Sequence, residues 1–187
     1  VKCNSKIDVR LIKTFYNDSY LGCYDKWYQV CRVKNEIMYR NNAIYKLYNS
    51  QELHSGSIFG IKIPKEICQL QNLHKLFFVS SYISEIPKEL CQLQNLQELF
   101  LWKNQISEIP KEICQLQYLQ TLDLVNNKIS EIPKEICQLH NLQKLYLNTN
   151  QINEIPKEIC QLYNLQQLHL SWNEISEIPK EICQLQN

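Results

Sequence analysis

Glycine is scarce in this chain of 187 residues, where it occurs only three times. A phosphate-binding loop needs several closely spaced glycines, so the sequence offers no such loop. No run of about 18 apolar residues occurs, which predicts no membrane-spanning helix. No charged segment followed by an apolar one marks a signal peptide near Val1, and we expect a native start upstream of that residue.

Charge of one sign is not concentrated in the chain, whose formal net charge is +1. Residues 1–55 carry nine Lys/Arg against five Asp/Glu, and residues 56–187 carry eleven against fourteen. A nucleic-acid-binding groove would instead cluster cations on one face. The sequence therefore predicts no nucleic-acid partner.

Proline occurs six times, and every proline belongs to one repeat. The six are Pro64, Pro87, Pro110, Pro133, Pro156 and Pro179, each 23 residues after the last. Each stands in nearly the same ten residues, of which 86–95 (IPKELCQLQN) are one copy. A fixed period of this length is typical of stacked supersecondary units that share a continuous core.

The repeats divide the chain into three parts. Residues 50–72 are a degenerate first repeat, and residues 73–187 are five regular repeats. Residues 1–49 do not repeat, and the apolar residues between Tyr24 and Tyr48 roughly follow helical spacing. We predict that this segment is a small, mostly helical cap, because the end of a repeat stack must be covered.

The repeat from Leu119 to Asn141 shows how one unit folds. Leu122 and Leu124 alternate with polar neighbours, which predicts a strand with its leucines turned inward. Pro133 suits the first turn of a short helix, on which Ile136 and Leu139 face the core. An amide that both donates and accepts closes the bend after each strand. These amides form a predicted ladder of Asn104, Asn127, Asn150 and Asn173, which Ser81 interrupts.

The repeat, LxxLxLxxNxIxxIPxxIxxLxx, resembles the leucine-rich repeat family from about residue 50 to residue 187. It is most similar to the 23-residue repeats of bacterial (Leptospira-like) and giant-virus proteins and of the intracellular Ras-related plant and animal group. This chain has Cys where many of those repeats have Gly. The resemblance implies an α/β solenoid, a curved right-handed superhelix. A parallel β-sheet would line its concave face, and short helical or 3-10 segments its convex face.

Outward strand positions are where the repeats differ most, so they are the candidate partner-binding residues. The candidates are Lys75, Phe77, Val79, Tyr82, Glu98, Phe100, Trp102, Lys103, Asp123, Val125, Lys144, Tyr146, Asn148, His169 and Trp172. Phe77, Phe100 and Trp102 are expected to form one aromatic patch of the kind found at protein interfaces. The alternative is that these rings only pack across strands or against the N-terminal segment.

Cysteine occurs nine times, six of them at one position of the repeat. No Cys-x-x-Cys pair occurs and the repeat cysteines lie 23 residues apart, so we predict no metal site and no cofactor. Small thiols packed between convex segments explain the row. Neighbouring thiols would oxidise readily, so we expect a reducing cytoplasm, that of the host if the protein is viral.

Catalysis is not expected, because Asp123 and His169 lie two strands apart, roughly 10 Å, too far for a hydrogen bond. We predict a non-enzymatic module that binds a protein or peptide on its concave face. One alternative is an adaptor whose N-terminal region recruits degradation or signalling machinery. Leu21, Cys23, Trp27 and Val30 there faintly resemble part of an F-box. The other is a structural protein that self-associates through an open end near Ile178, which either docks onto another copy or is followed by more chain.

Overall fold

The computed structural model describes residues 51–55, 62–63 and 65–185. The predicted cap over residues 1–49 lies outside these residues. No helix among them is long and apolar enough to span a membrane.

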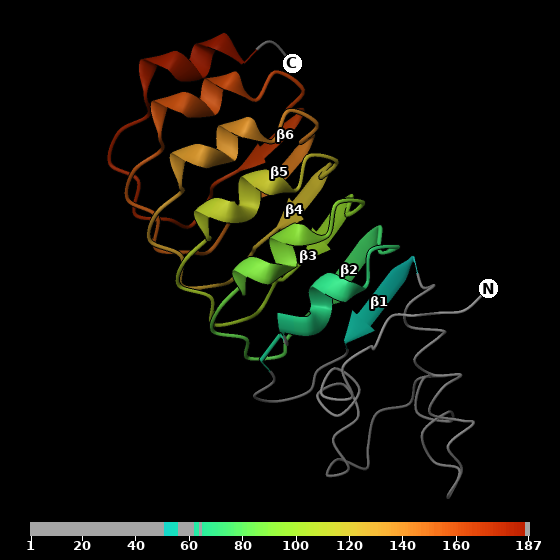
Figure 1. Ribbon diagram of the computed structural model, residues 1–187. Coiled ribbons are helices and arrows are strands. Elements are labelled where there is room, and N and C mark those ends of the chain that lie inside the picture. Colours follow the sequence, from blue (N-terminus) through green and yellow to red (C-terminus); the bar gives the residue numbers. More distant parts are fainter. Residues whose placement is uncertain (1–50, 56–61, 64, 186–187) are drawn as a thin grey trace, which may run out of the picture.

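Six short strands form one parallel sheet in sequence order. They are β1 (Glu52–Ser55), β2 (Lys75–Phe78), β3 (Glu98–Phe100), β4 (Thr121–Asp123), β5 (Lys144–Tyr146) and β6 (Gln167–His169). Each strand pairs with the equivalent residues of the next one, so that Leu76, Leu99 and Leu122 are in register. The predicted solenoid with its parallel sheet is confirmed. Figure 1 shows the strands along one face of the stack and the helical segments along the other.

The convex face consists of five-residue 3-10 helices rather than α-helices. They are η1 (Lys65–Gln69), η2 (Lys88–Gln92), η3 (Lys111–Gln115), η4 (Lys134–Gln138), η5 (Lys157–Gln161) and η6 (Lys180–Gln184). Pro133 does not occupy the first turn, as expected, but the N-cap position, with extended backbone at φ −64° and ψ 134°. The helix ends when the Leu139 N–H donates to the carbonyl of Ile136. Proline suits this cap because the position requires no backbone donor.

The core is a column of aliphatic side chains between the sheet and the convex helices. In the repeat that begins at Leu119, seven aliphatic side chains are exposed by 6% or less. They are Leu119, Leu122, Leu124, Ile129, Ile132, Ile136 and Leu139. Because each layer is covered by the layers on both sides, this burial depends on the neighbours. In the last layer, Leu168, Leu170 and Ile175 are only partly buried.

A ladder of asparagine side chains ties each layer to the one before it. The Asn127 amide accepts a hydrogen bond from the N–H of Ile106 and donates to the carbonyls of Leu101 and Leu124. Asn150 makes the equivalent three bonds one repeat later. At the first position of the ladder, Ser81 donates its hydroxyl to the carbonyl of Val79 instead. The ladder therefore begins at Asn104 and runs to the end of the sheet.

Candidate partner-binding surface

The concave face consists of the strand residues that alternate with the buried leucines. Leu99, Leu122 and Leu145 are fully buried on the core side of β3, β4 and β5. The residues on either side of each leucine are half-buried and form rows across the sheet in strict register. One row contains an aromatic or imidazole ring on five of the six strands, namely His54, Phe77, Phe100, Tyr146 and His169, with Asp123 on β4. We call this the ring row.

The first three members of the ring row are stacked face to face. The ring centroids of His54 and Phe77 lie 4.0 Å apart, and those of Phe77 and Phe100 lie 4.6 Å apart, with interplanar angles of 7° and 5°. These distances match the spacing of neighbouring strands, about 4.8 Å. Trp102 makes no ring stack with them in the described part of the chain; its indole lies under Lys103 Nζ at 5.1 Å.

Sequence reasoning missed His54 as a member of this row. It lies 23 residues before Phe77, one full repeat, and this spacing was the signal that could have found it. The degenerate letters of the first repeat obscured it.

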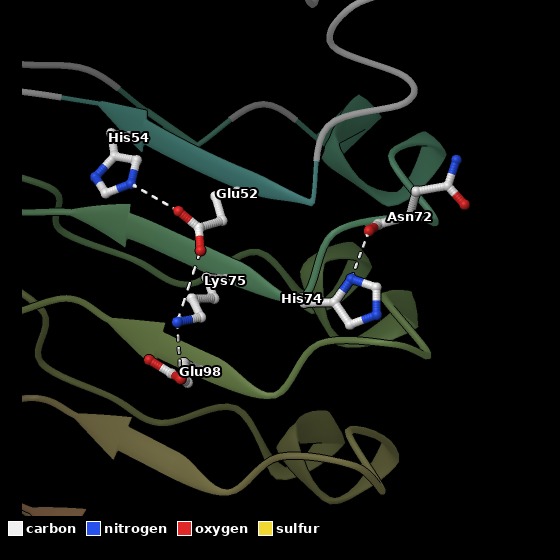
Figure 2. A network of polar contacts seen from close by, with 6 residues as sticks. All are labelled: Glu52, His54, Asn72, His74, Lys75 and Glu98. Atoms are coloured by element: carbon white, nitrogen blue, oxygen red, sulfur yellow. Dashed lines mark hydrogen bonds and ion pairs between the residues drawn. The ribbon is translucent and has the colours of Figure 1, made fainter.

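A row of charged side chains lies beside the stacked rings, as Figure 2 shows. Lys75 Nζ lies 3.3 Å from Glu98 and 3.6 Å from Glu52. The hydrogen bond and the charge of Glu98 raise the pKa of Lys75. His54 Nε2 lies 3.7 Å from Glu52 on the same strand. These exposed pairs contribute little to stability, since water screens them, but they leave both carboxylates with a cation beside them.

Asp123 is the carboxylate of the concave face that has no such cation. Its Oδ1 accepts a hydrogen bond of 3.0 Å from the backbone N–H of Val125, two residues on. No ion pair joins it to any residue that the structure describes, including Lys144 on the neighbouring strand. Burial raises the pKa of Asp123, and the Val125 N–H opposes that rise.

The far half of the concave face is polar. The rings of Tyr146 and His169 meet edge to face, with centroids 5.0 Å apart at 89°. The Tyr146 hydroxyl donates to the side-chain oxygen of Gln167. Asn148 donates to the hydroxyl of Ser171 at 2.7 Å. This half therefore offers hydroxyl, amide and imidazole groups rather than stacked rings.

The turn after each strand adds exposed side chains in an unusual backbone conformation. Residues with positive φ, between 52° and 59°, are Ser80, Tyr82, Lys103, Asn126, Thr149 and Trp172. This left-handed region favours glycine or asparagine, yet none of the six is glycine. Trp172 is 83% exposed and Tyr82 is 53% exposed. The remaining two candidates, Val79 and Val125, are half-buried within the sheet face.

The cysteine row lies on the convex helices, away from the sheet. Cys91 and Cys137 are buried, Cys183 is exposed, and the row's other members are partly exposed. Burial, with the nearby charge of Glu112, raises the pKa of the Cys91 thiol to about 12. Such thiols are protonated and chemically inert at neutral pH. Among the described residues, no three or more His, Cys, Asp or Glu side chains are placed to hold a metal ion.

Comparison with known families agrees with this geometry. The model described as "Leucine-rich repeat region" matches residues 99–151, and the one described as "Leucine Rich Repeat" matches residues 141–162 and 164–185. This is a leucine-rich repeat protein. Its repeats hold the fold in place of a single globular core. No protein of curated function matches the chain.

Solved structures of other leucine-rich repeat proteins share the fold. A repeat protein of Leptospira interrogans is 34% identical, with a TM-score of 0.60, over 95% of this chain and 55% of its own. A plant peptide hormone receptor, RGFR1 in complex with RGF2, is 34% identical, with a TM-score of 0.65, over 72% of this chain and 22% of its own. Internalin C2 of Listeria monocytogenes is 32% identical, with a TM-score of 0.59, over 66% of this chain and 52% of its own. The chain thus spans about a fifth of the receptor and about half of each bacterial protein.

Proposed function

We propose that this leucine-rich repeat protein is a non-enzymatic binding module whose concave face holds a protein or peptide partner. One observation carries the proposal. On the core side of the sheet every layer presents the same leucines, whereas the outer rows change from aromatic to charged to polar along the stack. Variation of chemistry on an unchanging frame is what a recognition surface requires. The likeness to a plant receptor solved with a peptide hormone supports a peptide or protein as the partner.

The aromatic side chains would supply most of the binding energy, as Trp and Tyr do at interfaces. Phe100 and Trp102 belong to one strand and its immediate continuation, and both are half-buried. Replacing both by alanine leaves the buried leucines in place, so the fold is expected to persist. Loss of one aromatic stack costs about 1 kcal/mol, which corresponds to a fall of a few degrees in the melting temperature.

The test is affinity capture from the source cell with the wild-type chain and two double variants. Phe100→Ala with Trp102→Ala is expected to abolish capture of the partner. Tyr118→Ala with Tyr163→Ala is the matched control, because these tyrosines are 59% and 64% exposed but lie in the loops between the convex helices and the strands. Capture that survives the first double variant and fails with the second would contradict the proposal.

Self-association is a second candidate, and one observation favours it. Ile178 is 67% exposed in the last described layer, beside the partly buried Ile175 and Ile182. A second copy that stacked there would bury these side chains and extend the sheet from β6. Light scattering across a concentration series tests this candidate: a mass that rises with concentration supports it, and a constant monomer mass rejects it. For location, the row of free thiols supports our proposal of a reducing cytoplasm.

A further inference from the structure

The ring row has one interruption, and it lies in the middle of the sheet. In register, β3 carries Phe100, β4 carries Asp123 and β5 carries Tyr146. The two rings are therefore separated by two strand spacings, about 9.6 Å. Between them stands a short side chain in place of a ring. The width left between the rings suits one flat group.

The stacked rings end at this interruption. Phe100 is stacked on Phe77 at 4.6 Å, so one face of its ring is covered. The stack follows the strand-to-strand direction, and hence its other face is turned toward the strand of Asp123. A flat group above Asp123 would continue the stack of His54, Phe77 and Phe100 by one more layer.

The charge at the interruption selects what that flat group is. The nearby cations are engaged elsewhere, since Lys75 lies between Glu52 and Glu98, and Lys103 lies over Trp102. Asp123 keeps one oxygen without a hydrogen bond in the described part of the chain. A half-buried carboxylate without a cation costs stability, and proteins keep such groups where they bind ligands.

We propose that Asp123, between Phe100 and Tyr146, is the docking point for an arginine side chain of the bound peptide. This inference rests on the proposed function of the concave face. A guanidinium is flat, stacks on aromatic rings and donates paired hydrogen bonds to a carboxylate. A lysine ammonium is a point charge and would leave the exposed face of Phe100 without a stacking partner.

Selection from a random peptide library displayed on phage tests the proposal without knowledge of the natural partner. The full chain, Asp123→Asn and Glu98→Gln serve as parallel targets. Asp123→Asn keeps an acceptor for the Val125 N–H, and Glu98→Gln removes a carboxylate that is already paired with Lys75. Wild type and Glu98→Gln are expected to enrich arginine at one peptide position, and Asp123→Asn is not. The selected peptides should bind Asp123→Asn about 10- to 100-fold more weakly, the range for a hydrogen bond to a charged group.

A double-mutant cycle completes the test. Replacing the enriched arginine of the peptide by alanine should weaken binding to wild type and change binding to Asp123→Asn little. Enrichment of lysine, a free amino terminus or no cation at all would overturn the arginine assignment while leaving concave-face binding intact. If no selected peptide loses affinity for Phe100→Ala with Trp102→Ala, the proposed function itself fails, and this inference fails with it.

Discussion

The side-chain oxygen of Asn127 accepts a hydrogen bond of 3.0 Å from the backbone N–H of Ile106, 21 residues earlier in the chain. This bond joins two layers at the buried bend where each strand ends. Asn127 is 8% exposed, so water is a poor substitute for the lost amide.

Asn127→Ala is expected to lower the free energy of unfolding by roughly 2–4 kcal/mol, because it leaves a buried N–H and two buried carbonyls short of a partner. Urea denaturation measures the loss. The control is Asn141→Ala, which removes an exposed amide that donates one bond to the carbonyl of Gln117. Equal losses for the two variants would contradict a special role for the buried ladder.

The left-handed turn residues give a prediction of the opposite sign. Thr149 is exposed and has φ 56°, a conformation that β-branched residues disfavour. Thr149→Asn is expected to raise the free energy of unfolding by about 1 kcal/mol, since asparagine tolerates this region and already occupies it at Asn126. Thr121→Asn, in the extended strand β4, is the matched control and should destabilise the chain. Thermal unfolding distinguishes the two, and stabilisation by both would refute the backbone explanation.

Much of the fold was predictable because its signals are local. The 23-residue spacing of the prolines, the alternation of Leu122 and Leu124 and the asparagine at each strand end are visible in any one repeat. Each corresponds to a separate physical requirement: a capped turn, a two-faced strand and a satisfied bend. The parallel sheet and the short convex helices follow from them, and both are confirmed.

What the sequence did not show depends on contacts between layers. Cys91 and Cys114 stand in nearly identical segments, KELCQ and KEICQ, yet the first is buried and the second partly exposed. No local letter carries that difference. Likewise, nothing in the residue types Thr149 and Trp172 indicates a left-handed backbone. The strand-end ladder imposes that conformation and overrides local preference.

The raised pKa of Asp123 predicts a pH-dependent effect on stability. The folded chain holds the carboxyl proton more tightly than the unfolded chain, because burial disfavours the charge. This stabilising contribution is complete below the ordinary value near 3.8 and is lost as the pH rises through the folded pKa. Asp123→Asn, which cannot ionise, should therefore have a higher melting temperature than wild type at pH 7 and no advantage at pH 3.

Melting curves from pH 3 to pH 8 check this expectation. Glu98→Gln is the control, since it removes the carboxylate paired with Lys75 and is not expected to stabilise the chain at pH 7. An advantage of Asp123→Asn that stayed the same at every pH would show that the charge of Asp123 is not its cause.

The cysteine row predicts a graded reactivity toward thiol reagents. The thiolate is the reactive form, and the pKa of about 12 leaves very little of it at Cys91. In the native chain at pH 8, we expect maleimide to label the exposed Cys183 first and the buried Cys91 last. Peptide mapping by mass spectrometry after timed quenching gives the order. Rapid labelling of Cys91 would mean that the convex helices open readily.

Hydroxyl-radical footprinting of the chain with its captured partner tests binding on the concave face most directly, because it reports on individual side chains. The account predicts that the partner protects Phe100, Trp102 and Tyr146 from oxidation. It also predicts that Tyr118 and Tyr163, which are exposed outside the sheet, are oxidised as fast as in the free chain. Protection of Tyr118 and Tyr163, with the sheet residues unchanged, would contradict it.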